Sequence, residues 1–406
     1  MKNVNLFTNR AIRYLFIFSI LGLFSACTSD DDSSDPILEE FNEPIVLDCN
    51  FFKEARVLTN DPYAPVDYIV TCVMHVTAPI KIEPGVVIEF EEDAGLEVDD
   101  FHTANGSISA MGTSTEPIIM RGTANNRGWW RGLMIDSNSS LNELNHTQIF
   151  DAGGKSFNSN NDKGAIIVWA DSRLKMTNSL VSNSDSYGIN ATYTSSILTI
   201  ENNKFTNNKA PAVVNPGYLN AMNNTNQFSG NIDDFVYVDP YGEPIKTPTT
   251  WYKLDVPYSV ISNAVKQVIV RDLLTIQPGV EIEFGAETSL LIHEDGGGIK
   301  AVGTSADPII FSAVSKVAKA WKGIYVSSEH AVNEIGHAEI RYSGLNAPQA
   351  NIWLWYNSFL NVHNVKFMSF NGCGINYRLL TGQSSNPNLT IGDNVTADNG
   401  CTTNIW

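Results

Sequence analysis

Basic residues are scarce in this chain of 406 residues, which has 26 Lys and Arg against 44 Asp and Glu and a formal net charge of −18. So little positive charge argues against nucleic acid as a partner, because the phosphates would not be neutralised. Leu/Glu/Lys heptads are also missing, which argues against coiled coils and helical bundles. Beyond the N-terminus, no segment is apolar for long enough to span a bilayer. The length then favours two domains or one elongated repeat fold.

The sequence also lacks the usual motifs of metal and catalytic sites. It has no CxxC pair and no His-rich cluster, so we assign no metal and expect no cofactor. The segment Asn158–Gly164 offers oxygen ligands, but its spacing is not that of a calcium loop. A catalytic cluster should occur once in the chain and not recur with the repeat described below. We find no such cluster of Asp or Glu with Lys or Arg on one face. We therefore assign no catalytic residue.

The N-terminus has the pattern of a targeting signal. Basic residues precede the short apolar segment Tyr14–Phe24, and Ser25-Ala26 leads directly to Cys27. This order resembles the lipobox of bacterial lipoproteins, although Phe24 stands where an aliphatic residue is usual. The resemblance implies a signal peptide over residues 1–26 and acylation of Cys27.

An acidic segment follows the cysteine. Residues 27–44 include the run Asp30-Asp31-Asp32 and little that could be buried, so we expect a flexible tether. Such a run after a lipidated cysteine resembles the surface-export signal of Bacteroidota lipoproteins. It implies a lipid anchor in the outer membrane and exposure at the cell surface.

The rest of the chain repeats itself. Ile80–Phe90 matches Leu274–Phe284, and three further matches follow in the same order: Trp130–Leu133 with Trp321–Ile324, Asn142–His146 with Asn333–His337, and Ser172–Asn190 with Ser358–Asn376. We interpret this as a tandem duplication with halves at 45–235 and 257–406. The Pro-rich segment 236–256 is the joint.

Each half contains short segments in which apolar residues alternate with polar ones: Val86/Ile88/Phe90, Ile108/Ala110, Leu133/Ile135, Ile166/Val168, Leu174/Met176 and Leu198/Ile200. Alternation bounded by Gly, Asn and Ser predicts short strands with one buried face. No amphipathic helix lies between them to cover these faces, so the strands must bury them against one another. A solenoid does this by coiling around a narrow core, and the sequence therefore predicts an all-β solenoid.

The motifs "IxPGVxIxF", "AxGTxxxPI" and "WxGI" of each half resemble those of the right-handed parallel β-helix proteins of the pectate-lyase-like superfold. In particular, the chain is similar to surface lipoproteins of that type from Bacteroidota. The resemblance covers nearly the whole mature chain and implies a right-handed parallel β-helix, duplicated in tandem. It does not imply an activity, because lyases, hydrolases, adhesins and structural proteins all use this fold.

Four further cysteines, in an exported chain, suggest two disulfides out of three possible connectivities. A β-helix coil takes roughly 20–28 residues and rises about 4.8 Å, so residues one coil apart lie within the range of a disulfide. Cys49 and Cys72 are 23 residues apart, and Cys373 and Cys401 are 28 apart. We expect each pair to join two neighbouring coils at one end of the solenoid.

Aromatic residues are the best ligand-facing candidates. Trp169 alternates with Val168, and Trp353 and Trp355 alternate with Leu354, so burial of the aliphatic residues points the indoles outward. Tyr356 follows them. Outward indoles on a rigid sheet are typical of surfaces that stack on sugars, and a covering loop is the alternative.

The combined prediction is a lipid-anchored, cell-surface β-helix that binds a glycan or another surface polymer without cleaving it. One alternative is a polysaccharide lyase or glycoside hydrolase of the β-helix type. Another is a structural or adhesive surface protein with a protein partner. The sequence does not identify the sugar or the oligomeric state.

Overall fold

The computed structural model describes residues 41–99, 105–159, 161–193, 195–241, 243–346 and 349–405. The proposed signal peptide, Cys27 and most of the tether lie outside these ranges. A compact unit begins at Phe41 and consists of short strands with two 3-10 helices, η1 (Phe51–Lys53) and η2 (Pro216–Tyr218). No α-helix occurs in the described ranges, and none of their helices has the length and apolar character needed to cross a bilayer.

Three sheets form the first part of this unit, and from β2 to β19 the chain visits them in rotation. The first sheet contains β1 (Ile45–Leu47), β3 (Tyr68–Val70), β6 (Val87–Phe90), β9 (Ile118–Gly122), β12 (Thr147–Phe150), β15 (Leu180–Ser182) and β18 (Lys204–Thr206). The second contains β2 (Arg56–Leu58), β5 (Pro79–Ile82), β8 (Ser107–Met111), β11 (Glu143–Asn145), β14 (Arg173–Thr177) and β17 (Ile197–Glu201). The third contains β4 (Val73–Val76), β7 (Gly95–Asp99), β10 (Gly132–Asp136), β13 (Ile166–Val168), β16 (Tyr187–Ala191) and β19 (Ala210–Val214).

The third sheet continues through the Pro-rich segment 236–256, because β20 (Val236–Val238) pairs with both β19 and β22 (Tyr258–Val260). From β22 the ladder runs through β25 (Glu281–Phe284) and β28 (Ile309–Ala313) to β30 (Glu334–Arg341). Beside it, a second ladder runs through β21 (Thr249–Trp251), β24 (Leu273–Ile276) and β27 (Gly298–Val302). This ladder pairs with the N-terminal part of β30. The long strand β32 (Leu360–Met368) follows β30 and pairs in turn with β34 (Leu389–Ile391) and β35 (Thr396–Ala397).

A separate sheet completes the second part. It contains β23 (Gln267–Val270), β26 (Ser289–Ile292), β29 (Gly323–Val326), β31 (Ala350–Leu354), β33 (Cys373–Tyr377) and β36 (Thr403–Ile405). We call it the aromatic sheet, because its outer side carries Tyr325, Trp353 and, just beyond β31, Trp355.

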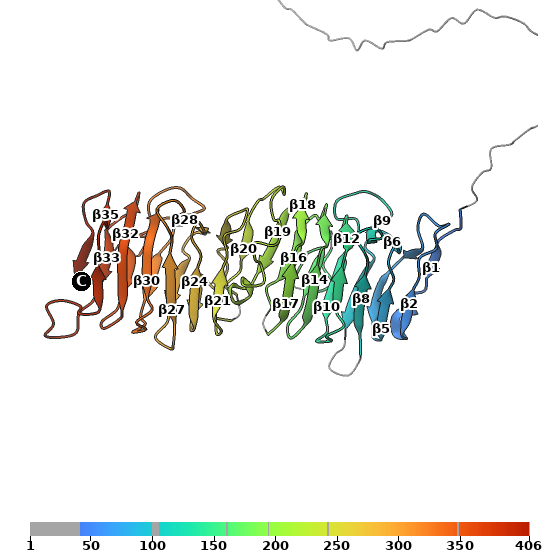
Figure 1. Ribbon diagram of the computed structural model, residues 1–406, viewed down its shortest axis with the longest axis horizontal. Helices are drawn as coiled ribbons and strands as arrows, with labels where there is room; N and C mark the ends of the chain where they lie inside the picture. Colours follow the sequence, from blue (N-terminus) through green and yellow to red (C-terminus); the bar gives the residue numbers. More distant parts are fainter. Residues whose placement is uncertain are drawn as a thin grey trace, which may run out of the picture. The chain divides into compact units, whose positions relative to one another are not determined.

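Every pairing between the described strands is parallel, and each links one coil to the next. The step is 23 residues between Ile45 and Tyr68 and reaches 37 between Val98 and Ile135. Figure 1 shows the consequence within this unit: the strands follow one another along a single direction in chain order, from blue β1 to red β35. This stack of parallel coils agrees with the predicted all-β class and is consistent with a β-solenoid.

The predicted alternation places the core between the sheets. Ile88, Ile108, Ile135 and Val168 are all fully or almost fully buried in one continuous apolar cluster. Large rings fill equivalent places in both parts of the unit: Trp130 stacks on Phe90 at 3.9 Å, and Trp321 stacks on Phe284 at 4.1 Å. Each indole Nε1 also donates to a backbone carbonyl, of Phe150 and Arg341 respectively.

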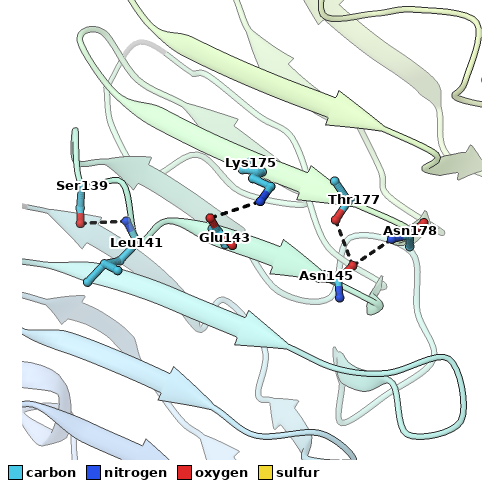
Figure 2. Close-up of polar contacts among 7 residues, drawn as sticks. All are labelled: Ser139, Leu141, Glu143, Asn145, Lys175, Thr177 and Asn178. Atoms are coloured by element: carbon cyan, nitrogen blue, oxygen red, sulfur yellow. Dashed lines mark hydrogen bonds and ion pairs between the residues drawn. The ribbon is translucent and has the colours of Figure 1, made fainter.

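Polar side chains connect the coils outside the core. Figure 2 shows this between β11 and β14, where Asn145 Oδ1 accepts from Thr177 Oγ1 at 2.9 Å and from Asn178 Nδ2 at 3.0 Å. On the same face, Lys175 pairs with Glu143 at 3.4 Å. The amides thus bond from coil to coil, and Asn178 adopts the left-handed backbone of a tight turn, with φ of 52°.

A disulfide joins neighbouring coils at each end of the unit. Cys49 bonds to Cys72 with a Cα–Cα distance of 6.1 Å, and Cys373 bonds to Cys401 with a distance of 4.8 Å. These pairs have the connectivity that the coil length predicts. They restrain the terminal coils, which have a stacking neighbour on one side alone.

Candidate functional site

The outward aromatic residues of the second part lie at the end of β31. Ile352 and Leu354 are buried in the core, so the alternating Trp353 and Trp355 project from the outer side of the aromatic sheet. Tyr356 follows in a turn and is 38% exposed. Trp355 is half-buried.

Backbone and amide hydrogen bonds fix this turn. The Trp355 amide donates to the carbonyl of Val326 in the preceding coil at 3.0 Å. Asn386, from the following coil, donates through Nδ2 to the Tyr356 carbonyl at 2.8 Å. Tyr356 has a φ of 44°, a left-handed conformation that these bonds on both sides hold in place. The two rings are therefore presented by a preorganised turn.

A groove of about 340 Å³ opens beside these rings. Its lining combines aromatic, hydroxyl, amide, imidazole and carboxylate groups: Leu291, His293, Glu294, Ser327, Glu329, Trp355, Tyr356, Asn357 and Ser358. Three successive coils contribute these residues, since they lie in or directly after β26, β29 and β31. The groove thus crosses the coils rather than following one of them.

A cation supports the aromatic pair. The guanidinium of Arg378, just after β33, lies 5.8 Å from the centroid of the Trp355 ring and 5.2 Å from that of Tyr356. The two rings are 6.1 Å apart and tilted by 50°. Cation–π attraction between Arg378 and each of the two rings limits their motion. This restriction reduces the entropy that is lost when a ligand stacks on the rings.

The expectation of an exposed indole at Trp353 is wrong. This side chain is only 3% exposed, although its alternation with Leu354 does direct it away from the core. Tyr325 is its partner one coil earlier, and the two rings stack at 5.6 Å with an angle of 8°. The Tyr325 hydroxyl accepts from Asn346 Nδ2 at 2.8 Å, and burial raises the pKa of this tyrosine. Trp353 therefore supports the sheet instead of offering a free surface.

Trp169 lies on a different sheet and does not join this groove. It follows β13 of the third sheet, is half-buried, and its ring lies 3.9 Å from that of Tyr193. Tyr193 also donates a hydrogen bond to Asp162 at 2.5 Å. Of the four predicted aromatic residues, Trp355 and Tyr356 are brought together, while Trp169 and Trp353 pack against tyrosines.

Sequence reasoning missed the polar side of the groove. His293, Glu294, Ser327 and Glu329 stand in turns after two other strands, and nothing in their local spacing connects them with Trp355. The coil register brings them together. An alignment of the two repeats could have identified His293 as a candidate. It aligns with Asp99, so it is not one of the structural residues that recur in both repeats.

No protein-family model, curated protein or solved structure matches this chain. The chemistry of the groove must therefore be judged from its own side chains. Two supported aromatic rings offer stacking faces, and the surrounding hydroxyl, amide and carboxylate groups offer hydrogen bonds to a ligand rich in hydroxyls. The described residues thus form an open, partly apolar surface with directed polar groups.

Proposed function

We propose that this protein is a lipid-anchored protein of the cell surface that binds a glycan or another surface polymer without cleaving it. The observation that carries the proposal is the groove beside Trp355 and Tyr356. A pyranose ring has an apolar face and a rim of hydroxyls, which fits two aromatic rings surrounded by polar side chains.

Charge narrows the class of ligand. Glu294 and Glu329 are exposed at the groove, and the chain as a whole carries a formal charge of −18. Like charges would repel a uronic-acid polymer. We therefore expect neutral polysaccharides to bind more tightly than acidic ones.

The test is affinity electrophoresis in gels that contain neutral or acidic polysaccharides, after a glycan array has selected the ligands. One stacked ring contributes about 1 kcal/mol, so Trp355→Ala should weaken binding by about five- to tenfold. The double variant Trp355→Ala/Tyr356→Ala should remove detectable retention.

Two variants serve as matched controls. Trp169→Ala removes an indole that lies on another sheet, and Tyr63→Ala removes a tyrosine that is 70% exposed far along the chain from the groove. Both should be retained as wild type is. A folded double variant with unchanged retention would refute the proposal.

A second candidate function, cleavage of the glycan, is favoured by one observation: two carboxylates, Glu294 and Glu329, line the same groove. Such a pair can serve as acid and base in glycoside hydrolysis. Release of reducing ends or unsaturated sugars by wild type, and its loss in Glu294→Gln or Glu329→Gln, would favour the enzyme over the binding protein.

The finer description of the fold is also a proposal: a right-handed parallel β-helix, duplicated in tandem and related to the β-helix surface lipoproteins. The recurring stacks of Trp130 on Phe90 and of Trp321 on Phe284 support it. So do His146 and His337, which share a φ of 44° at matching positions. An experimental structure tests both the handedness and the superposition of the halves.

The proposed location depends on Cys27. If this cysteine is acylated, Cys27→Ala should release the protein from the membrane fraction, and mass spectrometry should find lipid on the wild-type N-terminal peptide. Protection of the chain from added protease in intact cells would argue against exposure at the cell surface.

A further inference from the structure

The third sheet brings three metal-binding side chains together on its outer side. His75 lies on β4, and Glu97 and Asp99 lie on β7, its neighbour in the next coil. His75 Nδ1 is 2.9 Å from Asp99 Oδ2 and 3.5 Å from Glu97 Oε2. One ligand atom from each residue lies within 4.8 Å of the other two. No other such group of three occurs in the described ranges.

We propose that His75, Glu97 and Asp99 bind a divalent transition-metal ion, with Zn²⁺ as the best fit. A tetrahedral site with bonds of about 2.0–2.2 Å has ligand atoms about 3.3–3.6 Å apart. The separations from His75 Nδ1 are close to this range before any adjustment to an ion. An imidazole nitrogen suits Zn²⁺ and disfavours Ca²⁺ and Mg²⁺, which take oxygen ligands.

The state of Asp99 is the independent observation that supports a cation. Its side chain is only 1% exposed, and its Oδ1 is buried without a hydrogen-bond partner. A buried carboxylate oxygen without a partner is costly, and an ion bound by both oxygens of the Asp99 carboxylate would satisfy it. Among the described residues, His75 is the one ion-pair partner of both Asp99 and Glu97.

A further carboxylate lies beside this group. Asp136 on β10 is the register partner of Asp99. The positive charge of Arg131 acts on Glu97, but the guanidinium donates its hydrogen bonds to the backbone carbonyls of Asp93 and Ser156. At ion-pair distance, the His75 imidazole is thus the one cationic group that Glu97 and Asp99 share among the described residues.

The site is accessible and leaves a coordination position open. The His75 side chain is 51% exposed, whereas Glu97 is 15% exposed. Three protein ligands leave the fourth tetrahedral position for water or an external group. Sequence motifs do not predict this site, because its ligands come from two coils and do not follow a short metal-binding spacing.

The experiment is a Zn²⁺ titration by isothermal calorimetry of the full chain, after EDTA treatment and buffer exchange. Wild type should bind one Zn²⁺ per chain at this site. His75→Gln and Asp99→Asn should each weaken binding at least tenfold, since loss of even a second-shell partner costs about 10–100-fold. Ca²⁺ should not compete at equal concentration.

His363→Gln is the matched control, because His363 pairs with a single carboxylate, that of Glu334, at 3.1 Å. Its Zn²⁺ affinity should equal that of wild type. Zn²⁺ should also raise the melting temperature of wild type and of this control, but not that of Asp99→Asn. Equal Zn²⁺ binding by all variants, no binding by wild type, or preference for Ca²⁺ would overturn the proposal.

Discussion

When the sequences of the two proposed halves are aligned, β4, β7, β10 and β13 of the third sheet correspond to β23, β26, β29 and β31 of the aromatic sheet, yet the outer sides of the two sheets differ. Their inner residues match in kind: Leu96 and Val98 on β7 correspond to Leu290 and Ile292 on β26, and all four are buried. The outer residues do not match, because Glu97 corresponds to Leu291.

The difference extends to the neighbouring coils. His75 corresponds to Ile269 and Asp99 to His293, while Met134 and Ile167 correspond to the stacked Tyr325 and Trp353. In one half the outer side gathers metal-binding groups, and in the other it gathers aromatic rings. The inner side builds the coil and must repeat, whereas the outer side is free to acquire separate functions.

The two outer sides also belong to separate ladders. The sheet that carries His75 continues through β20 into β22, whereas the aromatic sheet begins anew at β23. A single ligand therefore does not have to contact both outer sides. We expect the proposed Zn²⁺ site and the proposed glycan groove to act independently.

The strongest test of the comparison is removal of the shared core rings. Trp130→Ala and Trp321→Ala each delete a fully buried indole with a stacked phenyl ring and a hydrogen bond. Each should lower the free energy of unfolding by about 3–5 kcal/mol, measured by urea denaturation. A loss below about 1 kcal/mol in either variant would show that the two halves are not built alike.

A second test separates two indoles on one outer side. Trp353→Ala should cost about 3 kcal/mol, because Trp353 is 3% exposed and stacked on Tyr325. Trp355→Ala should cost less than about 1 kcal/mol, since Trp355 is half-buried at the groove. Equal melting temperatures of the two variants would contradict this assignment.

Alternation and repetition in the sequence predict much of this molecule and leave the rest open. Apolar residues two apart identify the strands, as for Ile88 and Phe90 in β6, and the coil length fits the two disulfides. Alternation and repetition do not predict that Tyr325 covers Trp353 or that His75 lies beside Glu97. Those contacts depend on the register between coils, and the step from one coil to the next varies from 20 residues (Tyr68 to Ile88) to 37 residues (Val98 to Ile135).

Asp151 and Glu339 each align with a residue that is not acidic in the other half. Their carboxyl groups should make the free energy of unfolding depend on pH with opposite signs. Burial raises the pKa of Asp151, although a hydrogen bond from Asn183 opposes the shift. For Glu339, burial also acts to raise the pKa, but hydrogen bonds and charges of Arg341 and Lys366 outweigh it and lower the value. The corresponding residues in the other half are Tyr342 and Gln148.

A raised folded-state pKa means that Asp151 contributes stability below its unfolded pKa of about 3.9, and that this contribution is lost as the pH rises through the folded value. The stability of Asp151→Asn relative to wild type should therefore increase as the pH rises from about 3 to about 7. Glu339 contributes above its unfolded pKa of about 4.3 and loses that contribution as the pH falls. Glu339→Gln should thus be less stable than wild type at pH 7 and equal to it at low pH.

Each difference should stay within about 1 kcal/mol, because Glu339 forms its ion pairs near the surface and Asp151 keeps its amide partner. Urea denaturation of both variants and wild type across this pH range measures them. Differences that change with pH in the same direction for both variants would contradict the assignment.

The smallest expected effect concerns the histidines that recur in both halves. His146 and His337 both have a φ of 44°, which costs an L-residue about 1–2 kcal/mol and a glycine almost nothing. Glycine loses about 0.5–1 kcal/mol more backbone entropy on folding, so His146→Gly and His337→Gly should each change stability by less than about 1 kcal/mol. The two changes should have the same sign, and neither should alter Zn²⁺ binding. By contrast, His75 has Ile269 as its counterpart, and its replacement should weaken Zn²⁺ binding at least tenfold with little effect on melting in the absence of metal. If a recurring histidine proved necessary for Zn²⁺ and His75 did not, the division between repeated structural residues and unrepeated functional ones would fail.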